Sequence, residues 1–596
     1  MSPNPDQPEP SREADRLCVI KFGGSVLTGL ADYSEAASET YRHIRSGEKV
    51  IVIASALQGE TDALYEESEL VGAGASPVAR ARLVRLGEFR SAALMGLALD
   101  RIGVRVIVVD PGEIGLFAEG DPLDAGLCGL DVESLRKKIE CADAIVVPGF
   151  TASHHESGAA VLGRGGADLT AVMLAAKIGI RRARLIKNVD GVYTCNPAKN
   201  PAAVRFDRLD YTAATAASEG LIQDKAIHMA EAAGVQLEIA AMGAVQASCI
   251  MPGPAITGAL RNNQRKRIAL LGCGAVGSGV LDHVVRRPDL FDLNPVLVRD
   301  PGARSSDARA AFTSDAAIAL SDRLDLLVEM MGGADEPAVL MAEALSAGVD
   351  VVTANKAAVA RHFDALKDAA VRGGARLAYS AAVGGGAPMI ETVRRLRTPG
   401  VAGLEGVMNG TANFILSKLG EGRAFADALA EAQELGFAEA DPRADVEGHD
   451  AADKLSILIR EAFDISLPPE HIAKQSLAEI TPEMCAAAAA HGKVYKQIAR
   501  ARRTSGNAVD AAVTIEPVCL SHPFAGARNE QNRALITDIN GRIHAVFGKG
   551  AGRWPTAAAV FADIMDMQRS PACDNPVPDI QMPDRSAPGP TCLQPA

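Results

Sequence analysis

The chain alternates short β-branched segments with longer helical segments, and this pattern is interrupted once and then starts again. In the first half the expected strands are residues 17–22, 49–54, 104–109, 144–148 and 183–187, and helical segments such as 79–100 and 167–179 lie between them. In the second half strands are expected at 267–271, 295–299, 325–329 and 349–353, followed by helices and further strands to about residue 568. Because strands separated by helices pair in parallel, each half predicts an α/β unit of its own.

The interruption lies at residues 251–267, a segment broken by proline and glycine and locally basic. Such a composition is typical of an exposed linker, and its basic residues are expected to be solvated. We therefore predict a first domain over 17–250 and a linker over 251–266. The two ends, 1–16 and 569–596, are rich in proline and polar residues and are expected to be disordered, because they cannot bury enough apolar surface to offset chain entropy.

Charge and cysteine usage exclude several classes of function. The 61 basic and 74 acidic residues give a net charge of −13, which argues against nucleic acid as a main ligand. The ten cysteines are scattered without a CxxC pair, so neither a disulfide framework nor a zinc site is expected. No apolar run is long enough to span a bilayer. These features predict a cytoplasmic protein that acts on small molecules, without nucleic-acid or membrane partners.

Three glycine-rich segments in the first half indicate phosphate chemistry. The first expected strand runs into Lys21-Phe22-Gly23-Gly24-Ser25, where backbone amides can approach phosphate oxygens and the lysine can supply charge. A tight turn with a surface lysine is the structural alternative. The second segment, 162–170, contains Arg164, which can hold a carboxylate, and Asp168 near the start of a helix. The third, 187–193, ends a strand at an Asp-Gly turn.

These segments, KFGGS, LGRGGADLTA and NVDGVY in this order, resemble the amino acid kinase fold and, within it, the aspartate kinases, over roughly residues 17–250. The resemblance implies an αβα sandwich that uses ATP and Mg²⁺ to phosphorylate the β-carboxylate of aspartate. It assigns catalysis to Lys21 and Asp168. It assigns aspartate binding to Arg164, Glu88 and Ser25, and nucleotide contacts to Gly23, Gly24, Asp190 and Tyr193.

Several positions depart from the usual aspartate kinase pattern. Lys187-Asn188 replaces Thr-Asp, Ala198 replaces an arginine, and Gly220 stands where a nucleotide-binding lysine is expected. Each lost charge-assisted contact is worth about 1.5–3 kcal/mol, and Lys187 can compensate for one of them. Two interpretations follow: an active aspartate kinase, or a kinase fold that serves only binding or oligomerisation.

The second half opens with a dinucleotide-binding pattern. The strand at 267–271 leads into Gly272, Gly274, Ala275, Val276 and Gly277, a GxGxxG turn that precedes a helical segment. Arg299, at the end of the next expected strand, and nearby Arg304 favour the 2′-phosphate of NADP, with NAD as the alternative. A purely structural glycine turn is the non-functional interpretation.

An acid-rich loop over 436–448 leads into a helix that begins near Asp450. Asp450 and Lys454 are four residues apart and share one helix face. A lysine kept as ammonium by a carboxylate suits protonation of an alkoxide that forms from an aldehyde, and the other carboxylates can receive a substrate ammonium group. In isolation such a pair is more typical of a solvated helix surface.

The ordered motifs TANK (353–356), VGGGAP (383–388), VMNGTANFI (407–415), the acid loop and GKGAGRWPTA (548–557) resemble homoserine dehydrogenase over about 264–568. The resemblance implies a Rossmann-type domain over 267–395, an α+β substrate and dimerisation domain over 396–545, and a return to the dinucleotide domain over 546–568. It implies NAD(P)H-dependent interconversion of aspartate β-semialdehyde and homoserine.

Carried over by position, Lys454 is the proton donor and Asp450 its catalytic partner. The implied substrate-binding residues are Glu439, Asp445, Gly410, Thr411 and Lys356. Besides the glycine turn, Thr353, Lys356 and Gly552 are implied to contact the cofactor. Backbone carbonyls of Val383, Gly385 and Ala387 are implied to bind Na⁺ or K⁺, although Ser380 replaces a glutamate that is common at this site.

Together the halves resemble bifunctional aspartate kinase–homoserine dehydrogenases of aspartate-family amino-acid biosynthesis (threonine, methionine and lysine), which usually carry paired ACT modules between the catalytic units. Only residues 251–267 separate the halves here, so we expect no ACT-type control by threonine or lysine. A homodimer or homotetramer is expected. The alternatives are a monofunctional dehydrogenase with a non-catalytic first half, and a secondary-metabolism enzyme with an altered amino-acid substrate.

Overall fold

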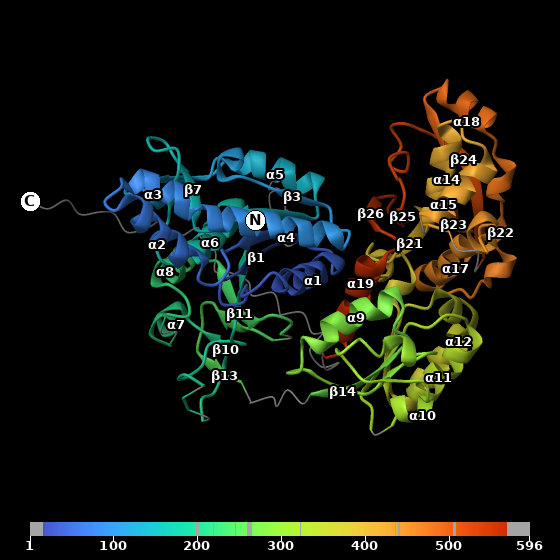
Figure 1. Cartoon of the computed structure of the whole chain (residues 1–596), viewed down its shortest axis with the longest axis horizontal. Coiled ribbons are helices and arrows are strands. Elements are labelled where there is room, and N and C mark those ends of the chain that lie inside the picture. Colours follow the sequence, from blue (N-terminus) through green and yellow to red (C-terminus); the bar gives the residue numbers. More distant parts are fainter. Residues whose placement is uncertain are drawn as a thin grey trace, which may run out of the picture.

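The computed structural model describes residues 16–197, 199–200, 202–217, 220–244, 246–258, 265–321, 323–435, 437–438, 441–504 and 508–568. The predicted tails, apart from Arg16, lie outside these residues. The chain forms three α/β units, and Figure 1 shows them in sequence colours: the first blue to green, the second green to yellow, the third orange. The predicted α/β class is confirmed, since each unit contains one main sheet covered by helices.

The first unit is an αβα sandwich around a mostly parallel nine-stranded sheet. In spatial order its strands are β13 (Ile256–Thr257), β10 (Phe206–Leu209), β12 (Ser248–Ile250), β11 (Gln236–Ala241), β9 (Arg182–Lys187), β1 (Leu17–Phe22), β2 (Lys49–Ala54), β6 (Ala144–Pro148) and β3 (Val106–Val108). A smaller sheet contains β5 (Gly126–Gly129), β4 (Phe117–Glu119), β7 (Thr151–His154) and β8 (Ala160–Val161).

Both faces of the large sheet are buried, which explains its continuous apolar strands. In β1, Ile20 and Phe22 pack toward α1 and α4, whereas Val19 packs toward α6 on the other face. The helices of this unit are α1 (Asp32–Arg45), α2 (Glu60–Gly72), α3 (Pro77–Val84), α4 (Leu86–Arg101), α5 (Val132–Cys141), α6 (Gly166–Ile178), α7 (Tyr211–Ala217) and α8 (Asp224–Ala233).

The second unit is a parallel sheet of the Rossmann type. Its strands run in the order β17 (Phe312–Thr313), β16 (Val296–Leu297), β14 (Lys266–Leu271), β18 (Leu326–Glu329), β19 (Asp350–Thr353) and β20 (Leu377–Ala378), with β15 (Phe291–Leu293) beside β14. Its helices are α9 (Ala275–Val285), α10 (Ala316–Ala319), α11 (Asp335–Ser346), α12 (Lys356–Gly373) and α19 (Arg553–Asp566), whereas the apolar side chains of α13 (Met389–Leu396) pack into the core of the third unit.

The third unit is a mostly antiparallel sheet with helices on it. The strand order is β22 (Ala473–Lys474), β24 (Val509–Cys519), β23 (Lys493–Arg503), β21 (Val401–Val407), β25 (Gln531–Asp538) and β26 (Ile543–Lys549). Its helices are α14 (Gly410–Gly420), α15 (Phe425–Glu434), α16 (Arg443–Val446), α17 (His449–Phe463) and α18 (Pro482–Ala489). After β26 the chain returns through α19, which packs beside α9 (Figure 1).

Among the predicted boundaries that differ from the structure, three concern a helix, the linker and the substrate sheet. The single helix predicted over 79–100 is divided into α3 and α4, which meet at Arg85 (φ = −60°, ψ = −19°). Part of the predicted linker forms β13, which pairs with β10, and β14 already begins at Lys266. The substrate sheet continues through Lys549, since β26 pairs with β25 along its length.

Candidate active sites

In the third unit, a buried carboxylate lies between two lysines. Asp450, in the first turn of α17, accepts a 2.8 Å hydrogen bond at Oδ2 from Lys454 Nζ, and its Oδ1 pairs with Lys356 at the start of α12. Lys454 Nζ also donates to the Met408 carbonyl at 2.6 Å. The helical spacing brings Asp450 and Lys454 together, whereas Lys356 comes from the second unit.

The two ammonium groups determine the charge state of this centre. Burial alone would raise the pKa of Asp450, but Lys454 and Lys356 hold it well below its usual range. In return, the charge of Asp450 raises the pKa of Lys356. Two cations and one anion therefore face the junction of the second and third units, where an oxyanion or a carboxylate would be stabilised.

Asn409 connects the predicted substrate residues. Its Nδ2 donates to Asp445 Oδ1 at 2.7 Å and to Asp450 Oδ2 at 2.9 Å, while its Oδ1 caps α14 by accepting from the Ala412 amide. Burial and the nearby Asp450 raise the pKa of Asp445. Gly410 begins α14, and Thr411 donates to the Phe437 carbonyl at 2.6 Å, so its hydroxyl holds the acid loop. Glu439 lies outside the described residues.

The glycine turn of the second unit is shaped for close approach of a ligand. Gly272 has φ = +94°, and a Cβ there would lie 2.7 Å from the Met330 carbonyl. A Cβ at Gly277 would lie 2.2 Å from the Gly272 carbonyl, whereas one at Gly274 would meet nothing within 4 Å. The amides of Ala275 and Val276 begin α9 beyond Gly274. This open turn at a helix N-terminus is the arrangement that a pyrophosphate requires.

The other residues predicted to contact the cofactor differ in their surroundings. Arg304 donates from its guanidinium to the Cys273 carbonyl within the turn, and Arg299 is exposed just after β16. Thr353 is buried and donates to Glu329 at 2.6 Å, so its hydroxyl is directed into the sheet. Gly552 has φ = +112° and immediately precedes α19.

The segment predicted to bind a monovalent cation is buried beside these elements. Val383 and Ala387 are fully packed, and the Ala387 carbonyl already accepts the Met389 amide at 2.8 Å. Ser380, which replaces the expected glutamate, is buried, and among the described residues its hydroxyl has no hydrogen-bond partner. Gly385, at φ = +55°, packs so that a Cβ would lie 2.7 Å from the Gly550 carbonyl. The missing carboxylate weakens the case for a cation here.

In the first unit, Lys21, Asp168 and Lys187 form a second buried charge cluster. Asp168 Oδ1 pairs with Lys21 Nζ at 2.7 Å, and Oδ2 accepts from Lys187 Nζ at 2.8 Å. Burial would raise the pKa of Asp168, but the two lysines hold it below its usual range. Burial and the charge of Lys21 lower the pKa of Lys187 to about 8. A Cβ at Gly23 would lie 2.9 Å from Lys21 Nζ, so the glycine leaves room for this ammonium group.

The remaining residues predicted for this site differ in exposure. Glu88 is buried, accepts weakly from the Ala56 amide at 3.4 Å, and its Oε2 has no hydrogen-bond partner among the described residues. Burial raises the pKa of Glu88 to about 8. Arg164 and Ser25 are exposed, and the Tyr193 hydroxyl donates to Asp190 at 2.6 Å. A buried carboxylate with one unpartnered oxygen is a suitable receptor for a substrate ammonium group.

Two contributors to the Asp450 cluster were not predicted from the sequence. Asn409 lies in the VMNGTANFI motif, and an Asn that precedes a helix is a recognisable N-cap. The Met408 carbonyl carries no signal in the sequence, because any residue supplies the same backbone oxygen. In the first unit, Lys187 was expected to compensate for a lost charge, and the structure brings it to Asp168.

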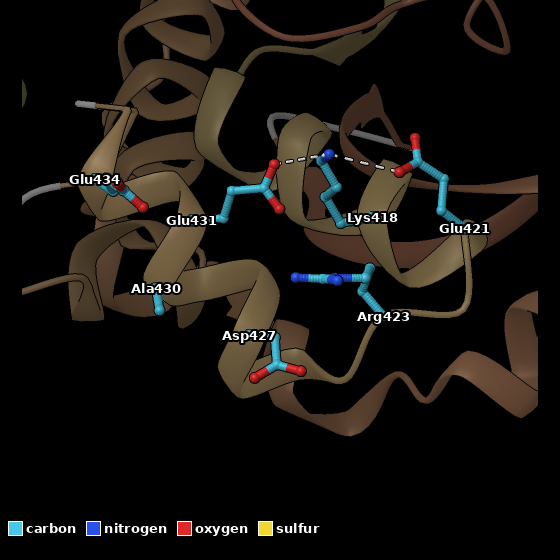
Figure 2. Close-up of a pocket in the computed structure, with 7 residues that line it drawn as sticks. All are labelled: Lys418, Glu421, Arg423, Asp427, Ala430, Glu431 and Glu434. Carbon is cyan, nitrogen blue, oxygen red and sulfur yellow. Dashed lines mark ion pairs between the residues drawn. The ribbon is translucent and has the colours of Figure 1, made fainter.

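Two further features lie apart from these clusters. An open surface pocket of about 610 Å³ lies between α14 and α15, where Lys418 pairs with Glu431 at 2.8 Å. Figure 2 shows that the side chains lining it are mainly charged. The ligand atoms of Cys18, His43 and Glu48 lie within 4.8 Å of one another, but Glu48 already pairs with Arg182 and burial raises the pKa of the Cys18 thiol.

Among the described helices, none combines the length and apolarity needed to cross a membrane.

Family comparisons agree with this division of the chain. Residues 16–241 match the model of the amino acid kinase family, residues 272–380 that of the homoserine dehydrogenase NAD binding domain, and residues 388–565 that of homoserine dehydrogenase. The predicted fusion of the two families is therefore confirmed.

Individual relatives match one half of the chain. A homoserine dehydrogenase from Corynebacterium glutamicum is 35% identical over 322 residues, which are 51% of this chain and 72% of that protein. One from Pseudomonas aeruginosa is 34% identical, over 53% of this chain and 75% of that protein. A solved homoserine dehydrogenase from Thiobacillus denitrificans is 34% identical, covers 51% of this chain and 74% of that chain, and has a TM-score of 0.49. The chain belongs to the homoserine dehydrogenase family and carries an amino acid kinase family domain ahead of its dehydrogenase domains.

Proposed function

We propose that the second and third units reduce aspartate β-semialdehyde to homoserine and catalyse the reverse oxidation, and that Lys454 is the proton donor. The observation that carries this proposal is the Lys454–Asp450–Lys356 cluster at the junction of the second and third units. A bound nicotinamide dinucleotide supplies the hydride. As the aldehyde oxygen gains negative charge, the Lys454 ammonium group transfers a proton to it, and the hydrogen bond to Asp450 orients that group beforehand.

The acidic residues nearby account for recognition of the amino-acid part of the substrate. Asp445 lies next to Asp450 through Asn409, and we propose that it receives the substrate ammonium group together with Glu439. Lys356 is placed by the Asn355 cap of α12 and faces the same carboxylate cluster, so it can bind the substrate carboxylate or the cofactor. Purified protein assayed with homoserine and NADP⁺ or NAD⁺ tests the reaction, and no oxidation with either cofactor would contradict it.

We propose that NADP is preferred because Arg299 and Arg304 flank the glycine turn. Replacing both with serine is expected to raise KM for NADPH about ten- to hundredfold and to leave KM for NADH within about twofold, since a lost charge-assisted contact is worth about 1.5–3 kcal/mol. Steady-state kinetics with each cofactor measures this. Exposed Arg286, at the other end of α9, provides the matched control R286S. Equal rises in both KM values would show that no 2′-phosphate is recognised.

For the first unit we propose an active aspartate kinase with ATP and Mg²⁺. The Lys21–Asp168–Lys187 cluster supports this, because two lysines beside a glycine turn provide the charge that a transferring phosphoryl group needs. Glu88, buried with an unpartnered oxygen, is proposed to receive the aspartate ammonium group, and exposed Arg164 its α-carboxylate. The alternative is that this unit only binds or oligomerises. We also propose that the chain assembles as a homodimer or homotetramer and that it is located in the cytoplasm.

The lowered pKa of Lys187 predicts a pH dependence for ATP use. With a pKa of about 8, Lys187 loses its charge as the pH rises through 8, so kcat/KM for ATP at saturating aspartate is expected to fall above that pH. In K187R the guanidinium stays charged, and the fall is expected to move to higher pH. Initial rates between pH 6.5 and 9.5 measure both profiles. Identical profiles for wild type and K187R would assign the pH dependence to another group.

A further inference from the structure

The first unit packs directly against the dinucleotide unit. Helices α1 and α4 of the first unit and helices α9 and α19 of the second contribute to one continuous cluster of buried apolar side chains, and Figure 1 shows α19 and α9 beside α1. Tyr41 on α1 and Phe561 on α19 both belong to this cluster. The two halves are therefore joined by a shared core as well as by the chain connection at 258–265.

One buried arginine of the first unit reaches through this interface. Arg45, the last residue of α1, is 7% exposed and donates from Nη2 to Asp563 Oδ1 at 2.6 Å and to Asp566 Oδ2 at 3.1 Å. Its Nη1 donates to the Ala559 carbonyl at 3.3 Å. Asp563 is 2% exposed, so this ion pair is almost fully removed from water. Such a pair costs desolvation energy and stays in place only when its geometry is well satisfied.

The second oxygen of Asp563 holds the segment of the dehydrogenase that contains the glycine motif. Asp563 Oδ2 accepts the Ser380 amide at 3.0 Å, and Ser380 begins the short turn that leads into Val383–Pro388. The three groups thus form a relay from Arg45 to Asp563 to the backbone of Ser380. We call residues 380–388 the glycine segment.

The first unit also encloses the glycine segment from the side. The Arg45 carbonyl accepts from Arg395 on α13, the helix that follows the segment, at 2.7 Å. A Cβ at Gly386 would lie 2.7 Å from the Ile102 carbonyl at the end of α4. Lys549, whose carbonyl accepts the Gly386 amide, donates to the Asp100 carbonyl at 2.9 Å. Groups of the first unit therefore lie against the glycine segment, against α13 and against Lys549.

The glycine segment in turn supports the catalytic lysine. Val383 and Ala387 belong to the same buried core as Ala451 and Leu455, which flank Asp450 and Lys454 on α17. Met408, whose carbonyl accepts from Lys454 Nζ, belongs to this core too. Because packed interiors transmit small displacements, a shift of the segment is expected to move the Lys454 ammonium group.

We propose that Arg45 is a positioning residue for the dehydrogenase: through Asp563 and Ser380 it holds the glycine segment and so the geometry of Lys454. The kinase-fold unit is then a structural part of the dehydrogenase site, whether or not it phosphorylates aspartate. This inference rests on the proposed homoserine oxidation.

The test compares R45M and R45K with R287M. Arg287 lies at the same interface, where it donates to the Met242 carbonyl at 3.0 Å, but it is not part of the relay. R45M is expected to lower kcat for homoserine oxidation about tenfold or more and to leave the Kd for NADPH, measured by fluorescence, within about twofold. R45K, which keeps the charge, is expected to recover part of kcat, and R287M to resemble wild type. Equal kcat in R45M and R287M would overturn the proposal.

Two further measurements separate positioning from general stability. Amide hydrogen exchange of a peptide that contains 379–388 is expected to increase in R45M and D563A and to stay unchanged in R287M. The double variant R45M/D563A is expected to be no slower than the slower single variant, because both residues act through one relay. Unchanged exchange, or additive losses, would contradict the relay.

If R45M does not fold, R45K and D563A provide the same comparisons. If wild-type protein does not oxidise homoserine, the proposed function fails, and the exchange measurement still decides whether Arg45 holds the segment. Wild-type oxidation with unaffected variants would overturn only the positioning role.

Discussion

Replacement of Lys454 with alanine is expected to lower kcat for homoserine oxidation and semialdehyde reduction by about 10²–10⁴-fold, the usual range for loss of a positioned general acid or base. Lys454 donates to Asp450 and to the Met408 carbonyl, which fixes its ammonium group in the cluster. NADPH binds at the glycine turn of the second unit, so its Kd is expected to change by less than about threefold. Stopped-flow or steady-state kinetics and a fluorescence titration measure the two quantities.

The structure indicates that this variant will fold. Asp450 keeps its second ion pair, with Lys356, so no buried carboxylate is left without a counter-charge. The matched control is K418A, which removes a lysine of α14 that pairs with Glu431 at the surface of the same unit. Turnover of K454A close to that of K418A would exclude the proton-donor role. A large rise in the Kd for NADPH would instead place Lys454 in cofactor binding.

Replacement of Lys21 with methionine is expected to lower aspartate-dependent ADP formation by about 10²–10³-fold, the effect of removing one preorganised group that stabilises transition-state charge. Lys21 and Lys187 share Asp168, so the variant retains one ion pair to this buried carboxylate. Coupled-enzyme detection of ADP, with and without aspartate, measures the rate. Homoserine oxidation by the same preparation is expected to stay within about twofold of wild type, which shows that the protein is folded.

K177M serves as the control for this variant, since Lys177 is exposed on α6, the helix that carries Asp168. Wild-type protein without aspartate-dependent ADP formation would favour a non-catalytic first unit. An active wild type with an equally active K21M would remove Lys21 from the mechanism. The two results separate an inactive kinase fold from a wrongly assigned residue.

Much of the fold was predictable because its strands are buried on both sides. The expected strands 17–22, 49–54 and 144–148 coincide with β1, β2 and β6, whose apolar runs are typical of strands buried on both faces. The break between α3 and α4 was not predictable, because Arg85, where the two helices meet, keeps right-handed helical backbone angles (φ = −60°, ψ = −19°). The antiparallel order of β21–β26 depends on pairings between strands far apart in the chain.

The candidate sites, too, were predictable only where their residues are close in the sequence. The proximity of Asp450 and Lys454 follows from helical spacing, and the open turn at Gly274 follows from GxGxxG before a helix. The pairing of Lys356 with Asp450 and of Lys187 with Asp168 required separate elements to meet. The fractional charges of Glu88 and Lys187 near neutral pH arise from burial, which no local pattern shows.

The sequence by itself thus determined that two α/β halves follow one another, which ordered motifs they carry, and which side chains lie one helical turn apart. These are properties of periodicity and spacing, and they act over a few residues. Only the tertiary structure decided that α1 and α4 share a core with α9 and α19, and that Arg45 reaches Asp563 and, through it, Ser380. The physical reason is that a buried charge is stable only beside its partner, and in this chain that partner lies more than half the sequence away.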